Sequence, residues 1–167
     1  GILFGSRTKY YRSYDLGTSW ELESSTIINS DINAVEVLND SIIVAGGVQS
    51  GGGGVPTGRI IRSDDGGWTW TLVHPTYGYL TDIDFPDEQT GYAVTSSGII
   101  YKTTDGGMTW NPQTNPEGMP LESVAFFGSQ TGWAAGGIGG FSSLVYTNDG
   151  GNTWQSQESG ITFPYGH

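Results

Sequence analysis

Four aspartates recur along the chain within one eight-residue pattern, Ser/Thr-x-Asp-x-Gly-x-Thr/Ser-Trp, at residues 13–20, 63–70, 103–110 and 147–154. A repeated carboxylate could bind calcium or act as a catalytic acid. Four equivalent turns spread through a repeat protein, however, cannot all form one active site. Aspartate two residues before glycine favours a turn, because the carboxylate accepts backbone N–H groups and the glycine takes a positive φ. We therefore expect the pattern to be structural.

The tryptophan that ends each copy of the pattern is expected to pack between strands. The predicted structural residues are Asp15, Gly17, Trp20, Asp65, Gly67, Trp70, Asp105, Gly107, Trp110, Asp149, Gly151 and Trp154. Trp68 lies inside the second copy, where the other copies have Thr18, Met108 and Asn152. An exposed indole at this turn could stack on a sugar or on a partner surface, so Trp68 is the candidate ligand contact.

The densest acidic cluster consists of Asp82, Asp84, Asp87 and Glu88. A glycoside hydrolase needs two carboxylates about 5 to 10 Å apart in one cleft. Asp82 and Asp84 are two residues apart and are expected on one face of a strand, whereas the other two fall in the following turn. The turn glycine and distal glutamate of an EF-hand calcium loop are missing. We expect these acids to be structural or solvated.

Other catalytic chemistries lack their residues. The chain has no cysteine and two histidines in unrelated contexts, which argues against zinc sites, cysteine nucleophiles and catalytic triads. A sialidase would need an arginine cluster. Here Arg12 and Arg62 occupy the same repeat position, with Lys102 and Tyr146 as counterparts, which favours salt bridges or a shallow cationic ring encoded by the repeat. No catalytic residue, cofactor or metal site is expected.

The composition narrows the partner classes. The 167 residues contain 6 Lys plus Arg and 17 Asp plus Glu, giving a net charge of −11. Because six cations are too few to build a phosphate-binding surface, no nucleic acid partner is expected. No run approaches the roughly 18 apolar residues that span a bilayer, which predicts no membrane insertion. An aromatic content of 13% argues against disorder.

Short β-prone runs precede each copy of the pattern. First runs lie at 34–38, 80–85 and 121–127, second runs at 41–47, 91–94 and 132–137, and third runs at 59–62, 99–102 and 143–146. A fourth run begins at each pattern tryptophan. Four short strands recurring every 40 to 50 residues predict a β-propeller blade.

The third runs carry adjacent apolar pairs, Ile60 with Ile61 and Ile99 with Ile100. A strand that is apolar on both faces is expected to be buried on both faces, between neighbouring blades. We therefore predict an all-β fold, a β-propeller of four-stranded blades with about four blades and 15 strands. The blade units are expected at about 1–25, 29–75, 79–114 and 119–158 of a single domain.

The repeated pattern resembles the Asp-box, or BNR repeat, of sialidases, glycoside hydrolase propellers and the sortilin luminal domain. In residues 85–110 the longer pattern Phe-x-Asp-x-x-x-Gly-Tyr-Ala precedes Tyr-Lys-Thr-Thr-Asp-Gly-Gly-x-Thr-Trp. This segment is similar to the photosystem II stability/assembly factor-like propellers and to related repeats of secreted bacterial proteins. The first copy departs most, with Leu16 inside the turn. The resemblance implies the fold more strongly than the function, because propellers host unrelated activities.

The expected function is a non-catalytic recognition or scaffolding domain that presents loops at one end of the ring to a protein or glycan partner. The assembly-factor resemblance favours a protein. The alternative is a glycoside hydrolase propeller or a fragment of one. The acidic composition and the absence of cysteine favour an exported protein, secreted or on the cell surface, with a periplasmic location left open.

The first unit lacks its first strand, which leaves two ways to complete the ring. Residues 160–167 could add the missing strand and close four blades. Alternatively, the chain is a fragment of a larger propeller, completed by further chain or by self-assembly. Pro164 lacks the N–H that a central strand needs, which favours the fragment. A glycine-rich insertion at 50–58 and a shorter one at 138–141 are expected on one face of the ring.

Overall fold

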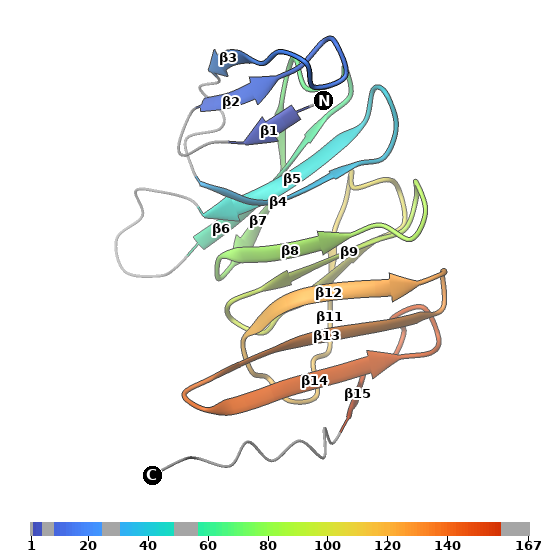
Figure 1. Ribbon diagram of the computed structural model, residues 1–167. Coiled ribbons are helices and arrows are strands. Elements are labelled where there is room, and N and C mark those ends of the chain that lie inside the picture. Colours follow the sequence, from blue (N-terminus) through green and yellow to red (C-terminus); the bar gives the residue numbers. More distant parts are fainter. Residues whose placement is uncertain (1, 5–8, 25–30, 49–56, 158–167) are drawn as a thin grey trace.

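The computed structural model describes residues 2–4, 9–24, 31–48 and 57–157 (Figure 1). Within these ranges the chain forms fifteen strands in four antiparallel sheets, and it forms no helix. No helix capable of crossing a membrane occurs in these same ranges. The predicted all-β fold of blade-like sheets is confirmed.

Each sheet is a meander in which strands that follow one another in sequence pair. The first and second sheets contain β1 (Ile2–Phe4), β2 (Lys9–Arg12) and β3 (Glu21–Ser24), then β4 (Ile32–Val37), β5 (Ile43–Val48), β6 (Thr57–Ser63) and β7 (Thr71–Tyr77). The third contains β8 (Leu80–Asp84), β9 (Gly91–Thr95), β10 (Ile100–Thr103) and β11 (Asn111–Gln113). The fourth contains β12 (Leu121–Phe127), β13 (Thr131–Ile138), β14 (Phe141–Thr147) and β15 (Gln155–Ser156).

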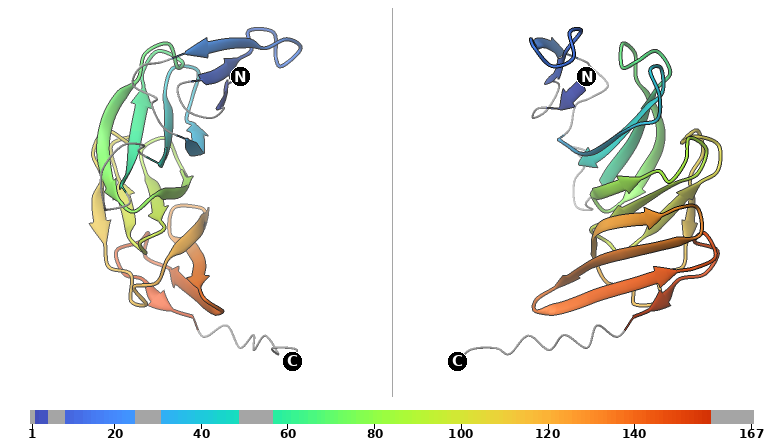
Figure 2. Two further views of the ribbon diagram at one scale, coloured as in Figure 1. Left: turned by 90° about the vertical axis from the view of Figure 1, so that its left-hand side faces the viewer. Right: turned by 45° about the vertical axis from the view of Figure 1, so that its right-hand side comes forward.

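The sheets follow one another along an arc, as Figure 2 shows. The first strand of the third sheet, β8, contacts both β4 and β12, so the first strands lie side by side on the concave side of the arc. The last strands β7 and β11 lie on its convex side (Figure 2). This is the radial arrangement of propeller blades.

Apolar side chains fill the joints between successive sheets. Ile61 and Trp70 pack with Tyr10 between the first and second sheets, whereas the adjacent Ile60 belongs to the cluster between the second and third. Both isoleucines are completely buried, which confirms that the third strand of this blade is covered on both faces. Each joint thus has its own small core.

A β-bulge interrupts the first strand of three sheets at the same repeat position. The pairing register shifts between Ile32 and Ala34, between Leu80 and Asp82, and between Leu121 and Ser123. The bulged residues of the second and third sheets reach the next sheet, because Asn33 Nδ2 donates to Leu80 O at 2.7 Å and Thr81 Oγ1 donates to Leu121 O at 2.8 Å. The bulge therefore serves the joint between blades.

Two segments singled out in the sequence are affected by the limits of the described residues. Residues 50–56 of the glycine-rich insertion lie outside them, and so does the whole tail, residues 160–167. The ends of β5 and β6 that flank this insertion lie at the same end of the sheets as the β13–β14 turn (Figure 1). We call this end the hairpin end and the opposite end, which carries the repeated aspartates, the Asp-box end.

Candidate functional site

The four aspartate turns share one hydrogen-bond pattern. In the second sheet, Ser63 Oγ donates to Asp65 Oδ1 at 2.8 Å and accepts the backbone N–H of Gly67 at 2.7 Å. The Asp65 carboxylate accepts the backbone N–H of Thr69 at 2.8 Å and its hydroxyl at 2.7 Å. The equivalent contacts recur around Asp15, Asp105 and Asp149. Gly67 has a φ of 87°, which favours glycine at this position.

These contacts stabilise the charged form of the aspartates. A backbone hydrogen bond from Thr153 holds the pKa of Asp149 at about 2, and hydrogen bonds from Thr69 hold the pKa of Asp65 at about 2. Burial works against this effect at Asp105, but hydrogen bonds from Thr109 outweigh it and lower the pKa of Asp105. A carboxylate held ionised by its own turn is a poor proton donor at neutral pH.

The pattern tryptophans lie beside these turns. The indoles of Trp70 and Trp110 are buried and donate to the carbonyl oxygens of Gly67 and Gly107, each at 3.1 Å. Trp154 is buried in the joint between the third and fourth sheets, whereas Trp20 of the first sheet is partly exposed.

A cation on the strand that precedes each of the first three aspartate turns reaches the aspartate turn of the next blade. Arg12 Nη1 donates to Gly66 O at 2.5 Å, Arg62 Nη1 donates to Gly106 O, and Lys102 Nζ donates to Gly150 O at 2.5 Å. These are the residues that share one repeat position in the sequence. The position therefore encodes a link between neighbouring blades.

The two links made by arginines differ in what accepts hydrogen bonds from Nε and Nη2 of the guanidinium. Asp64 Oδ1 accepts from Nε and Nη2 of Arg62 at 3.0 and 2.5 Å, which forms an ion pair. The counterpart of Asp64 in the first blade is Tyr14, and Nε and Nη2 of Arg12 have no hydrogen-bond partner. Arg12 is nevertheless only 6% exposed.

Aromatic rings surround Arg12 in place of the carboxylate. Its guanidinium carbon lies 4.5 Å from the ring centroid of Trp68 and 5.9 Å from that of Tyr14. The two ring centroids are 5.9 Å apart. Tyr14 and Trp68 are 56% and 59% exposed, so they form a partly solvent-exposed aromatic surface over a buried cation. We call Arg12, Tyr14 and Trp68 the aromatic–arginine patch.

A cavity of about 170 Å³ opens beside this patch, between the first and second sheets. It is lined by Arg12, Ser13, Tyr14, Val37, Asn39, Asp40, Ile43 and Gly66. We call it the joint pocket. Sequence reasoning identified Trp68 as a candidate contact but missed Tyr14 and the pocket. The signal that could have found Tyr14 is the alignment of the repeats, in which Tyr14 has the same position as Asp64.

Two members of the acidic cluster connect neighbouring blades. Asp82 Oδ2 accepts the hydroxyl of Ser123 and the backbone N–H of Val124, each at 2.9 Å, and Asp84 Oδ2 accepts the backbone N–H of Phe126 at 2.7 Å. All these donors belong to β12. The carboxylates on β8 therefore fasten the third sheet to the fourth.

The other two members stabilise turns at the Asp-box end. Asp87 Oδ1 accepts the backbone N–H groups of Gln89 and Thr90 at 2.8 and 2.7 Å. Glu88 Oε2 accepts from Asn39 Nδ2 at 3.0 Å, across to the second sheet. All four acids of the cluster thus have structural partners.

Glu36 on β4 faces the acids of β8. Burial raises the pKa of Glu36, and the charges of Asp84 and Asp82 raise it further. Burial likewise raises the pKa of Asp84, although the hydrogen bond from Phe126 opposes the shift. In the part of the chain that the structure describes, no group of three or more His, Asp or Glu side chains is arranged to hold a metal.

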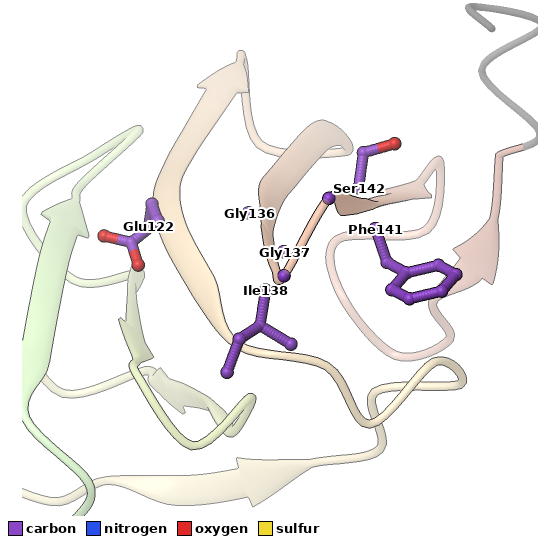
Figure 3. A pocket seen from close by; sticks show the side chains of 8 residues that line it. Glu122, Gly136, Gly137, Ile138, Phe141 and Ser142 are labelled. Carbon is purple, nitrogen blue, oxygen red and sulfur yellow. The ribbon is translucent and has the colours of Figure 1, made fainter. Parts of the chain in front are cut away.

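A second hollow, of about 540 Å³, lies at the hairpin end on the fourth sheet (Figure 3). Its lining includes Glu122 of β12, Gly136 and Gly137 of β13, and the β13–β14 turn. Ile138 and Phe141 are 63% and 74% exposed there. Glu122 has the bulge position from which Asn33 and Thr81 reach the next blade, so this surface continues the side on which successive blades pack.

The chain matches a family model and individual relatives. Residues 68–164 match the family described as Photosynthesis system II assembly factor YCF48. The photosystem II assembly lipoprotein Ycf48 of Synechococcus sp. (strain CC9902) is 38% identical over 77 residues, which are 44% of this chain and 22% of that protein. The matched region thus spans about a fifth of that relative's length.

Solved structures share the fold. YCF48 from Cyanidioschyzon merolae has a TM-score of 0.64 at 19% identity, covering 92% of this chain and 54% of that chain. A structure of YCF48 bound to D1 peptide gives 0.51 at 18% identity, covering 95% and 78%. The GH74 xyloglucanase from Xanthomonas campestris gives 0.67 at 15% identity, covering 95% and 27%. The fold is that of β-propellers, and by its sequence the chain belongs to the family of the Photosynthesis system II assembly factor YCF48.

Proposed function

We propose that this chain is a non-catalytic part of a β-propeller that recognises a protein partner at its Asp-box end. The observation that carries the proposal is the aromatic–arginine patch, where Tyr14 and Trp68 expose large ring surfaces over a buried cation. Tryptophan, tyrosine and arginine are the residues that most often dominate the binding energy of protein interfaces.

Family membership supports a protein partner. A YCF48 structure contains a D1 peptide, so a peptide of this kind is the first ligand to test on this chain. The Synechococcus relative is named a lipoprotein, which supports an exported location in the periplasm or outside the cell. The structural role of the repeated Asp, Gly and Trp residues belongs to the same proposal: they hold the turns that present the patch.

The hydrolase alternative has less support. A glycosidase needs one carboxylate as acid and another as base or nucleophile, free to reach the substrate. Asp82 and Asp84 instead accept hydrogen bonds from the backbone of β12. The likeness to a GH74 enzyme, at 15% identity, concerns the fold alone.

Fluorescence anisotropy with a labelled D1 peptide and the full chain tests the proposal. We expect Trp68→Ala to weaken binding at least tenfold, about 1.4 kcal/mol, because the indole forms the largest exposed surface of the patch. Trp133→Ala is the matched control, since it removes another partly exposed tryptophan, from β13 of the fourth sheet. Circular dichroism checks that both variants fold.

Binding that is absent in the wild type, or equal in both variants, contradicts recognition at this patch. Release of reducing sugar from xyloglucan by the purified chain would favour the hydrolase instead. We expect no release above the background of the buffer.

A further inference from the structure

The surroundings of Arg12 in the joint pocket can be compared with those of Arg62, the equivalent residue in the next repeat. Around Arg62, all three guanidinium nitrogens are satisfied: Nη1 by Gly106 O, and Nε and Nη2 together by one oxygen of Asp64. The edge that carries Nε and Nη2 is the one that receives a carboxylate in side-on arginine pairs. The repeat thus shows which group this edge takes when the group is supplied by the chain itself.

Arg12 keeps the first half of this arrangement and lacks the second. Its Nη1 donates to Gly66 O as Arg62 Nη1 does to Gly106 O. Its Nε and Nη2 are buried without an acceptor, and the residue is more than nine-tenths buried. Stacked rings interact with the face of a guanidinium but leave the N–H groups at its edge without acceptors. A buried charged donor without an acceptor is an unfavourable state that a suitable ligand relieves.

The surroundings of Arg12 leave room for such a ligand. The cavity of about 170 Å³ corresponds to roughly six water molecules of liquid volume, enough for a carboxymethyl or carboxyethyl group. Tyr14 and Trp68 cover the guanidinium, and both are more than half exposed, so rotation of these side chains can uncover its edge.

The charge of the lining selects among anions. Asp40 lines the same pocket, and no ion pair joins it to Arg12 among the residues described. One cation beside one carboxylate tolerates a ligand with a single negative charge better than a dianion such as phosphate. The pocket therefore suits a carboxylate rather than a phosphate group.

We propose that the joint pocket binds a carboxylate of the protein partner through Nε–H and Nη2–H of Arg12, with Tyr14 and Trp68 packing against the residue that carries it. This inference rests on the proposed protein-binding function and names the group that is recognised. The carboxylate takes the position at Arg12 that Asp64 takes at Arg62. It comes either from an acidic side chain or from the C-terminus of the partner.

Titration of the ¹⁵N-labelled full chain, followed at the Arg12 Nε–H resonance, tests the proposal. Arg12→Gln assigns the resonance by its loss. Acetyl-glutamate amide presents a side-chain carboxylate, acetylglycine presents a C-terminal one, and acetyl-glutamine amide is the neutral control. We expect a saturable downfield shift with at least one carboxylate and none with the glutamine compound; the carboxylate that binds more tightly identifies the source. Shifts with neither carboxylate, or equal shifts with the neutral control, overturn the proposal.

Two substitutions at position 14 separate charge from shape. Tyr14→Asp supplies an internal carboxylate as the second blade does, so we expect it to weaken binding of the small carboxylates at least tenfold. Tyr14→Asn removes the same ring without adding charge, so any loss of ring packing is common to both variants, and we expect Tyr14→Asn to bind the small carboxylates about fivefold more tightly than Tyr14→Asp. Equal binding by the two variants would show that the guanidinium edge is not the site.

The same variants separate this inference from the proposed function. If the D1 peptide binds, and Trp68→Ala weakens its binding but Tyr14→Asp does not, then the patch recognises protein and the proposed carboxylate site is wrong. If the small carboxylates bind at Arg12 while the D1 peptide does not bind, the carboxylate site stands and recognition of the D1 peptide is wrong.

Discussion

The joint between the first and second sheets and the joint between the second and third are built from the same repeat. Both contain a buried arginine that donates to the aspartate turn of the next blade. Among their differences, one concerns the edge of the guanidinium. Asp64 accepts from Nε and Nη2 of Arg62, whereas Tyr14 has that position in the first blade and Nε and Nη2 of Arg12 have no acceptor. A single exposed position therefore decides whether a repeat-encoded contact only joins two blades or also has unused hydrogen-bond capacity.

Removing the two arginines should affect stability unequally. We expect Arg62→Met to lower the free energy of unfolding by about 2 kcal/mol, because it removes hydrogen bonds of a charged group to Gly106 O and Asp64. Arg12→Met should cost less than about 1 kcal/mol, because the lost bond to Gly66 O is offset by removal of two buried donors without acceptors.

Urea unfolding of the full chain measures both effects. Lys9→Met serves as the control, since Lys9 is an exposed cation on the same strand as Arg12. Equal losses for the two arginine variants would mean that the two joints do not differ in the way described.

Acid should weaken the aspartate turns. The folded-state pKa values of Asp15, Asp65 and Asp149 are about 2, below the ordinary 3.8, so these groups stabilise the fold above about pH 4. This stabilisation is lost as the pH falls from about 4 to 2. Glu36 and Asp84 act in the opposite direction, because their raised pKa values favour the fold when they are protonated.

Asp149→Asn isolates the contribution of one turn. Melting temperatures between pH 5 and 2 should fall less steeply for this variant than for the wild type. Glu122→Gln is the control, because it removes an exposed carboxylate at the hairpin end. An unchanged slope for Asp149→Asn would show that the turn does not stabilise the carboxylate charge.

The smallest expected effect concerns Leu16, the residue by which the first turn departs from the others. Leu16 has a φ of 58° and is fully exposed, where the other turns have Gly66, Gly106 and Gly150. A left-handed conformation costs a non-glycine residue about 1–2 kcal/mol, partly offset by the flexibility that glycine adds to the unfolded chain. We expect Leu16→Gly to stabilise the chain by a few tenths of a kcal/mol in urea unfolding. Leu22→Gly, on the exposed face of β3, should destabilise it; destabilisation by both would show that Leu16 is not strained.

The sequence predicted the features that depend on local pattern. The spacing of the aspartates predicted the blades, and the adjacent Ile60 and Ile61 predicted a strand covered on both faces, because each follows from turn chemistry or strand periodicity. Trp68 could be singled out because it departs from its repeat equivalents.

Contacts between blades were less accessible to sequence reasoning. The hydrogen bonds of Asp82 and Asp84 join residues about 42 positions apart, and that of Arg12 joins residues 54 apart. No local pattern marks such pairs. Aligning the repeats shows that Tyr14 stands where Asp64 does, but the burial of Arg12 and the cavity beside it require the packed joint.

Under the proposed function, the recognition surface is the aromatic–arginine patch at the Asp-box end. Mapping of chemical-shift changes in the ¹⁵N-labelled full chain on addition of the D1 peptide tests it most directly. We expect the largest changes on Arg12, Tyr14 and Trp68, including the Trp68 indole N–H. Changes centred instead on Ile138 and Phe141 at the hairpin end would contradict it.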